Sequence, residues 1–327
     1  MTWLTWRQFR IPAASVYAAV VAVCAFLAIT GQNLVNRTDF SDMDVMYGGT
    51  SIMVYALPAV IGVFWGVPLV ARELETGTHN LVWNQSITRG RWLTTKLGVG
   101  VVAAVIAAGL LSAAVSWWAG PIDAAAAQET EYFALTRMSP VFFAARGIAP
   151  VGYAAFAFVL GVAVGVLLRR TVAAMAVTLV VFTAVMVAVP LFVRPYVLPP
   201  VEETIAIEPS SIMGIKGNES GVIEEIVFPK PPGAWMLANE TVDSTGTAVR
   251  PLPEVGDCLP PPASEDRLPD IAQIKACIGK LADLGYSQRV TYQPGSRFWP
   301  LQWLETGLFL ALSALLAWFC YRRIRHV

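Results

Sequence analysis

Long apolar segments alternate with short polar ones along most of the chain. Six of the apolar segments are about 20 residues long, which lets a helix cross a hydrocarbon core about 30 Å thick. We place them at 11–30, 52–71, 97–118, 148–168, 171–193 and 301–320. This pattern predicts an all-α polytopic membrane protein with six transmembrane helices.

The start of the chain, residues 1–10, combines aromatic and basic side chains at helical spacing: Trp3, Trp6, Phe9, Arg7 and Arg10. Trp and Arg both favour the interface between membrane and water. We therefore expect a short interfacial helix before the first span. The alternative is that these residues extend the first span.

Between spans five and six lies a longer segment, 194–300, rich in Pro, Gly, Glu and Ser. Its roughly 100 residues are enough for an independent domain. Short apolar runs predict strands in 201–250, and apolar spacings of three or four predict a helix over 264–284. We expect a mixed α/β domain. A disulfide between Cys258 and Cys277 is expected if this domain faces an oxidising compartment, and two free thiols otherwise.

Two features of the spans bear on how they pack. Gly161 and Gly165 form a GxxxG pattern, which permits close approach of a neighbouring helix. Pro58 and Pro68 both fall in span two or beside it, where they free backbone carbonyls and predict a kink.

The distribution of Lys and Arg indicates the orientation. If the N-terminus is cytoplasmic, most basic residues of the short connections lie inside: Arg7, Arg10, Arg72, Arg89, Arg91, Lys96, Arg169, Arg170, Arg322, Arg323 and Arg325. The outer loops 31–51 and 119–147 hold far fewer. We expect both termini in the cytoplasm and the domain 194–300 outside. Arg89, Arg91 and Lys96 are interpreted first as topology determinants and second as contacts with a partner. Arg169 and Arg170 form a tight basic turn that makes spans four and five a helical hairpin.

Composition agrees with a membrane protein and argues against several functions. The chain is 56% hydrophobic and 14% charged, with a net charge of zero, whereas soluble domains carry about 25% charged residues. We expect contact with membrane lipids and no nucleic-acid partner. The sequence contains no GxxxxGK[ST] phosphate loop and no His or Cys cluster with metal-ligand spacing. We expect no catalytic centre, cofactor or metal on this chain.

Few ionisable residues fall within the predicted spans, and Glu305 in the last span is the clearest one. Gln302 shares its helix face. Glu305 is expected to pair with Arg297 or Arg146 at the outer surface, or to line a pathway or outer gate with Gln302. Ion-coupled transporters usually need buried ionisable groups, so the chain shows no evident energy source of its own.

The polar segment 71–96 joins spans two and three. Its apolar residues at helical spacing are Val70, Leu74, Leu81 and Val82. This predicts a short amphipathic helix over about 72–84 at the inner membrane surface. Such a helix suits transmission of a push from a soluble partner. The alternative is an ordinary interfacial loop helix with a solvated acidic face.

The pattern Arg72-Glu73-x-Glu75-x-Gly77-Thr78, followed by Leu81, Ser86-x-Thr88-Arg89-x-Arg91 and Lys96, resembles the segment after the second span of ABC-2-type export permeases. Segments 147–179 and 292–307 are similar to an actinobacterial-type branch of that family. The resemblance covers the six spans, and it covers 194–291 poorly.

The resemblance implies the permease subunit of an ATP-binding cassette exporter in a bacterial plasma membrane. Its partners would be a second copy of this chain or a close homologue and two ATPase subunits, which would bind ATP and magnesium. Residues 1–10 would be the elbow helix, and 301–327 the last span with a basic tail. The coupling helix would present Glu73, Leu74, Glu75, Gly77, Thr78, His79, Leu81 and Trp83.

The substrate implied by the apolar spans is lipophilic or amphipathic. Two other functions stay open at this point. One is an ion-coupled secondary transporter, and the other is a non-transporting receptor or scaffold that uses its outer domain.

Overall fold

The computed structural model describes residues 2–34, 43–78, 88–126, 136–208, 214–217, 223–229, 231–250, 281 and 283–325. The chain divides into two compact units. The larger, helical unit consists of Met1–Asp123, Pro140–Val197 and Phe298–Val327. The smaller unit consists of Ala124–Ser139 and Leu198–Arg297.

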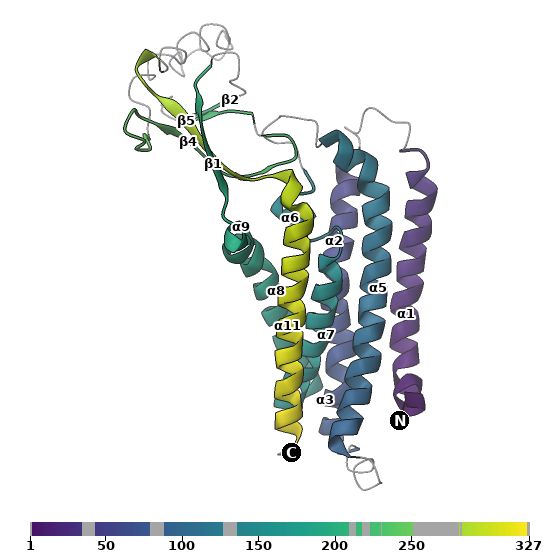
Figure 1. Cartoon of the computed structure of the whole chain (residues 1–327). Coiled ribbons are helices and arrows are strands. Elements are labelled where there is room, and N and C mark those ends of the chain that lie inside the picture. The colour runs from purple at the N-terminus through teal and green to yellow at the C-terminus, as the bar shows by residue number, and fades with distance from the viewer. Residues whose placement is uncertain are drawn as a thin grey trace, which may run out of the picture. The chain divides into compact units, whose positions relative to one another are not determined.

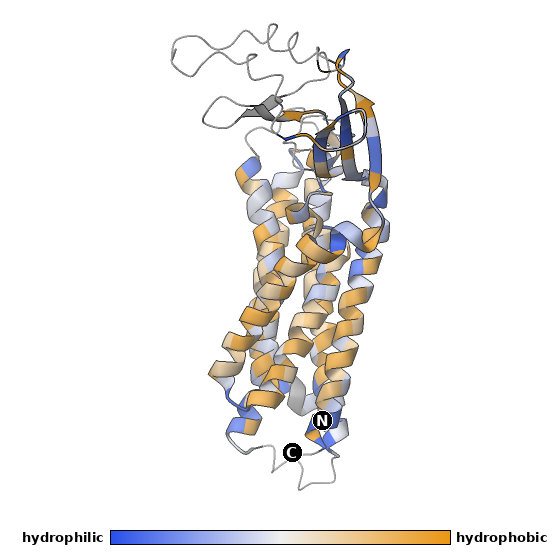
Figure 2. Cartoon of the chain, turned by 90° about the vertical axis from the view of Figure 1, so that its left-hand side faces the viewer, coloured by the Kyte–Doolittle hydropathy of each residue, from blue (hydrophilic) through white to orange (hydrophobic). Residues whose placement is uncertain are grey.

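Six helices among the described residues are long and apolar enough to cross a membrane: Phe9–Gly31, Asp44–Glu75, Arg89–Ala126, Ala149–Leu168, Thr171–Val197 and Gly295–Ile324. They confirm the six predicted spans. Figure 1 shows the helices side by side, with both ends of the chain at the same end of the bundle, as an even number of spans requires. Hydrophobic residues occupy the middle of the long helices (Figure 2).

The helical elements are α1 (Thr2–Gly31), α2 (Asp44–Val60), η1 (Ile61–Gly66), α3 (Val67–Glu75), α5 (Arg89–Ala126), α6 (Pro140–Phe143), α7 (Ala149–Leu168), α8 (Thr171–Ala188), η2 (Val189–Val193), α9 (Arg194–Val197), η5 (Gly295–Arg297) and α11 (Phe298–Ile324). The elements η1 and η2 are π-helical, and η5 is a 3₁₀ turn.

Span four, α7, lies at the centre of the helical unit. In its apolar window 83% of the residues are buried, against 17% in span one. Glycines allow this packing: a Cβ added to Gly161 would lie 2.2 Å from the carbonyl oxygen of Gly62 in η1. The predicted GxxxG pattern thus faces span two, since a Cβ added to Gly165 would lie 3.2 Å from the Cβ of Ala71.

Span two changes helix type between its two prolines. Pro58 lies inside α2, η1 follows, and Pro68 stands at the start of α3. Proline removes a backbone donor and disturbs the α-helical ladder, and π-turns are rare and often found at functional sites. A π-helical segment therefore lies between the two prolines, where the sequence predicts a kink.

The first ten residues do not form a separate helix. α1 is continuous from Thr2 to Gly31. One buried face runs along it, because Phe9, Ala13, Val20 and Leu27 are all at most 3% exposed. This periodicity crosses the position where the interfacial helix was expected to end. The structure therefore supports an extension of span one, and a separate elbow helix is not confirmed.

Of the helix predicted over 72–84, the structure describes only the residues up to Thr78, and these belong to the end of span two and the turn after it. α3 is the end of span two and stops at Glu75. Thr76 caps it, and Gly77 adopts a positive φ of 72°, a left-handed conformation that ends helices and favours glycine. His79, Leu81 and Trp83 lie outside the described residues.

Spans four and five form the tight hairpin that their basic connection predicts. Arg169 is the C-cap of α7 in a left-handed conformation, with φ of 52°. Its neighbour Arg170 is extended and precedes α8. Both side chains are exposed.

The smaller unit contains an antiparallel sheet in the order β1-β5-β4 and a hairpin of β2 and β3. The strands are β1 (Val201–Ala206), β2 (Gly214–Gly217), β3 (Ile223–Val227), β4 (Trp235–Val242) and β5 (Ser287–Gln293). In the register, Val201 pairs with Tyr292 and Trp235 with Gln293. The strands expected in 201–250 are present. Most of the predicted helix 264–284, with Cys258 and Cys277, lies outside the described residues.

Candidate functional site

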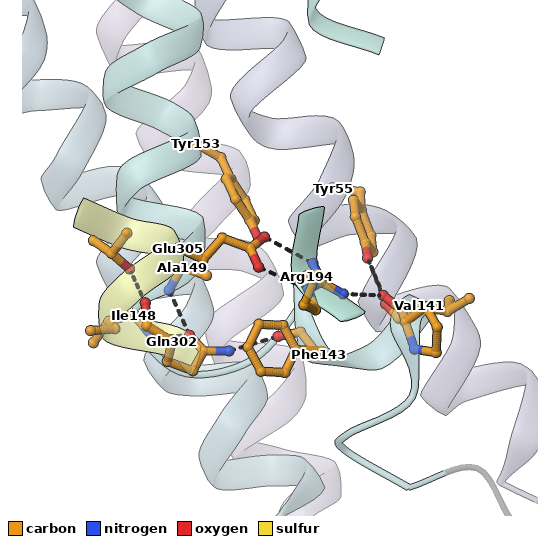
Figure 3. A network of polar contacts seen from close by, with 11 residues as sticks. Tyr55, Val141, Phe143, Ile148, Ala149, Tyr153, Arg194, Gln302 and Glu305 are labelled. Atoms are coloured by element: carbon orange, nitrogen blue, oxygen red, sulfur yellow. Dashed lines mark hydrogen bonds and ion pairs between the residues drawn. The ribbon is translucent and has the colours of Figure 1, made fainter. Parts of the chain in front are cut away.

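A buried ion pair joins the end of span five to span six. Arg194 of α9 donates from Nε to Glu305 Oε2 and from Nη2 to Glu305 Oε1, each at 2.8 Å (Figure 3). The two side chains are 1% and 6% exposed. Tyr153 of α7 donates its hydroxyl to the same carboxylate. A bidentate, charge-assisted contact of this kind fixes both distance and orientation.

The same guanidinium holds the four-residue helix α6. Arg194 Nη1 donates to the carbonyl oxygen of Pro140 at 3.0 Å, and its Cζ lies 4.3 Å from the centre of the Phe143 ring. Tyr55 of span two donates to the carbonyl oxygen of Val141 at 2.8 Å. We call this arrangement the α6 clasp: Arg194, Glu305, Tyr153 and Tyr55 around Pro140–Phe143.

Gln302, one turn before Glu305, connects the clasp to the start of α7. Its Oε1 accepts from the backbone N–H groups of Ile148 at 3.0 Å and Ala149 at 2.8 Å, and its Nε2 donates to the Phe143 carbonyl at 2.8 Å (Figure 3). These N–H groups open a helix and have no intrahelical partner. The fully buried Gln302 therefore caps α7.

A second arginine–acid–tyrosine group lies on the other side of α6. Arg146 Nε is 3.5 Å from Asp123 Oδ2, and Tyr47 donates its hydroxyl to the same carboxylate. The Phe142 ring packs 4.4 Å from the Tyr47 ring. Since Phe142 faces this group and Phe143 faces Arg194, α6 is held from both sides.

A third buried pair lies near the end of the bundle that holds the termini. Lys96 of α5 is 3% exposed, and its ammonium lies 2.7 Å from Glu73 Oε1. The same ammonium donates to the Leu69 carbonyl at 2.7 Å and lies 4.7 Å from the centre of the Trp92 ring. Lys96 thus fastens the last turns of span two to span three.

Glu75 makes a second connection from the end of span two. Its carboxylate accepts from the Thr171 backbone N–H at 3.0 Å and hydroxyl at 2.6 Å. Thr171 is the first residue of α8. A carboxylate at a helix N-terminus is favourable because of the unpaired N–H groups there.

The sequence interpretation of the candidate residues needs several corrections. Glu305 pairs with neither Arg297 nor Arg146, because Asp123 engages Arg146 and the Gln293 side chain accepts from Arg297 at 2.9 Å. Three charged residues just outside the predicted spans also form ion pairs that sequence interpretation did not identify. Arg194 pairs with Glu305, and both are buried, while the buried Lys96 pairs with the partly buried Glu73.

The remaining predicted residues are placed as follows. Leu74 is buried, Gly77 is half-buried, and Thr78, Arg89 and Arg91 are exposed.

Arg194 is the residue that the sequence interpretation missed. In the sequence, Arg194 comes directly after the apolar run of span five, and span six contains a single acid, Glu305. An arginine at the end of one span and an acid in the next are the signal that could have indicated this pair.

A small cavity of about 240 Å³ adjoins the clasp. Apolar side chains dominate its lining: Val189, Val193, Val197, Leu301, Leu304 and Leu308, beside Arg194 and Glu305. Within the described residues, no three His, Cys, Asp or Glu side chains are grouped to hold a metal ion. The residues of the clasp and of the cavity can pair charges and make apolar contacts.

The model of a family described as ABC-2 membrane transporter related matches residues 2–194, which end at the arginine of the clasp. Neither the curated proteins nor the solved structures gave a significant match.

Proposed function

This chain belongs to the ABC-2 membrane transporter related family, and on that premise we propose that it is the permease subunit of an ATP-binding cassette exporter. The family match, which includes most of the first five spans, is the observation that carries the proposal. Separate ATPase subunits would bind and hydrolyse ATP with magnesium. The exported substrate would be lipophilic or amphipathic.

The assembly we propose contains two permease chains and two ATPase subunits. The second permease is another copy of this chain or a close homologue, and the substrate passes between the two. We place both termini in the cytoplasm of a bacterium and the segment 194–300 outside. The exposed basic residues Arg89, Arg91, Arg169 and Arg170 support this orientation.

The contacts at the end of span two support a coupling role for the segment that follows it. The Glu73–Lys96 pair joins this end to span three, and the Glu75–Thr171 bonds join it to span five. A displacement of Gly77 and the residues after it would therefore move spans two, three and five together. We assign ATPase contact to Thr78, His79, Leu81 and Trp83, and transmission to Glu73 and Glu75.

At the opposite end of the bundle we propose that the α6 clasp acts as the exit gate (Figure 1). α6 is fastened by Arg194, Tyr55 and Gln302, which belong to spans five, two and six. Any change in the spacing of these spans must therefore break or move the clasp. An apolar cavity beside it suits an apolar substrate.

Co-purification tests the proposal. The chain is expressed with a candidate partner ATPase from the same organism, and the complex is isolated through a tag on the ATPase. We expect Leu81→Ala with Trp83→Ala to reduce recovery of the permease and its stimulation of ATP hydrolysis. Trp299→Ala, at a half-exposed residue of α11, serves as the control. Unchanged recovery and ATPase rate in the coupling variant would overturn the assignment.

A second candidate function is ion-coupled transport, which the buried carboxylate Glu305 favours, since such groups mark ion pathways in membranes. The two candidate functions differ in their energy source, which is ATP hydrolysis for the exporter and an ion gradient for ion-coupled transport. Transport that stops with a hydrolysis-deficient ATPase and persists with an ionophore supports the exporter. The reverse pattern supports ion coupling through Glu305.

A further inference from the structure

A cavity of about 490 Å³ lies between α1 and α3, near the end of the bundle that holds the termini. One part of its lining is apolar: Phe9, Pro12, Phe64, Trp65, Pro68 and Leu69. The other part is polar: Arg72, Glu73, Thr76 and Thr78. Along span two the apolar residues come first and the polar ones follow at its end.

This order matches the polarity of a membrane interface. An α-helix rises about 1.5 Å per residue, so the helical part of the lining, from Phe64 to Glu73, covers roughly 14 Å along the span axis. The apolar part therefore lies at hydrocarbon depth and the polar part at headgroup depth. Phe64 is 57% exposed, so the apolar part is open to the surrounding acyl chains.

The charge of the cavity favours an anion. Glu73 is the one acid among the described residues that line it, and the ammonium of Lys96 lies 2.7 Å from Glu73 Oε1. Arg72 is exposed and has no ion pair with another described residue. On α1, Arg7 and Arg10 on either side of Phe9 are also exposed. With Glu73 compensated, the positive charge of Arg72 dominates the polar end.

We propose that this cavity binds one anionic phospholipid. The guanidinium of Arg72 takes the phosphate, and an acyl chain lies along Phe64, Pro68 and Leu69. Arginine is suited to this role because its planar fork matches the oxygens of a phosphate. The volume lies within the range of ordinary ligand sites, about 300–1,000 Å³, and it fits a headgroup with the upper part of one chain.

The site goes beyond the proposed transport function and does not depend on it. A bound lipid would join α1 to the end of span two, the two elements on either side of the cavity. The link would lie within one turn of Glu73 and Glu75, which fasten that end to spans three and five.

Native mass spectrometry of the purified full chain tests the site. The protein is incubated with equal amounts of phosphatidylglycerol and phosphatidylcholine of the same chain length, and retained lipid is counted. We expect one phosphatidylglycerol to be retained in preference. Arg72→Gln lowers its affinity about tenfold, as expected for loss of one charge-assisted contact. Arg91→Gln, an exposed arginine near the same end of the bundle, has no such effect.

Chain contact is tested separately. Phe64→Ala lowers affinity for a long-chain phosphatidylglycerol more than for a short-chain one, whereas Ile106→Ala, at an exposed position of α5, affects neither. Three results would overturn the proposal: equal losses in Arg72→Gln and Arg91→Gln, equal retention of the two lipids, or displacement of the bound lipid by inorganic phosphate alone. The last would indicate a site for free phosphate.

Discussion

Arg194 and Glu305, 111 residues apart in the chain, meet through two N–H···O contacts of 2.8 Å inside the helical unit. The pair joins the end of span five to the beginning of span six. It also determines the position of α6, since the third guanidinium nitrogen, Nη1, donates to Pro140. One ion pair therefore connects two spans and a connecting helix.

Breaking this pair from one side is expected to destabilise the protein. Glu305→Gln leaves the guanidinium of Arg194 buried and uncompensated, and loss of one partner of a buried pair costs about 3–5 kcal/mol. Thermal unfolding in detergent measures the effect. Glu202→Gln, at an exposed residue of β1, is the control.

The double variant Glu305→Leu with Arg194→Met separates charge from packing. Replacing both partners by apolar groups leaves no unpaired charge, so this variant should unfold at a higher temperature than Glu305→Gln. A double variant less stable than the single one would show that the pair is not the main contribution of these side chains.

The Glu73–Lys96 pair gives a similar test at the other end of the bundle. Lys96→Met removes the ammonium that lies 2.7 Å from the carboxylate of Glu73, a residue that is 14% exposed. We expect Lys96→Met and Glu73→Gln each to destabilise the protein, and the double variant to lose clearly less than the sum, with a coupling energy of about 1 kcal/mol or more. Additive losses would contradict a direct interaction. Arg91→Met, at an exposed residue of the same helix, is the matched control.

Close packing of spans two and four is tested at Gly161. A Cβ there would lie 2.2 Å from the Gly62 carbonyl oxygen, so Gly161→Ala must separate the helices and should cost about 1–3 kcal/mol. Gly98→Ala is the control, because no atom lies within 4 Å of its added Cβ and alanine favours the helix. Equal melting temperatures for the two variants would contradict the packing.

In the smaller unit, the turn after β4 is expected to respond to acid. The hydroxyl of Thr245 and the backbone N–H groups of Thr247 and Thr245 donate to Asp243, and they hold the pKa of its carboxyl below the usual value. Its stabilising contribution is therefore complete above about pH 4, the unfolded pKa. The contribution is lost as the pH falls through the lower folded pKa.

The carboxyl ¹³C chemical shift of Asp243, followed by NMR over about pH 2–5, measures this pKa. We expect a midpoint below that of an ordinary aspartate. Replacing Thr245 by Val removes the hydroxyl and should move the midpoint upward. A midpoint at the ordinary value in the unmodified chain would contradict the turn.

The spans could be predicted from the sequence because their length and hydrophobicity are local properties. The hairpin at Arg169 and Arg170 could also be predicted, since two apolar runs meet there with no room for a longer loop. The end of span two could not be placed from apolar spacing alone. Val70 and Leu74 continue the helical pattern, but Gly77 takes a left-handed conformation and ends the helix.

The buried pairs were missed for a different reason. Lys96 lies among several basic residues that look like a solvated group, and its burial depends on Glu73 reaching it from another span. Arg194 follows an apolar run and looks like the start of the next domain. Its burial depends on Glu305, far away in the chain. Pairings between distant residues leave little trace in the local pattern of either one.

ATP hydrolysis in proteoliposomes tests the central claim most directly. The chain is reconstituted with a candidate partner ATPase from the same organism, and hydrolysis is measured with the intact permease, with Leu81→Ala and Trp83→Ala combined, and with the ATPase alone. If the chain is the permease subunit of an exporter, the intact permease changes the rate of ATP hydrolysis. In the coupling variant the rate returns to that of the ATPase alone. An ATPase rate that is the same in all three preparations would contradict the account.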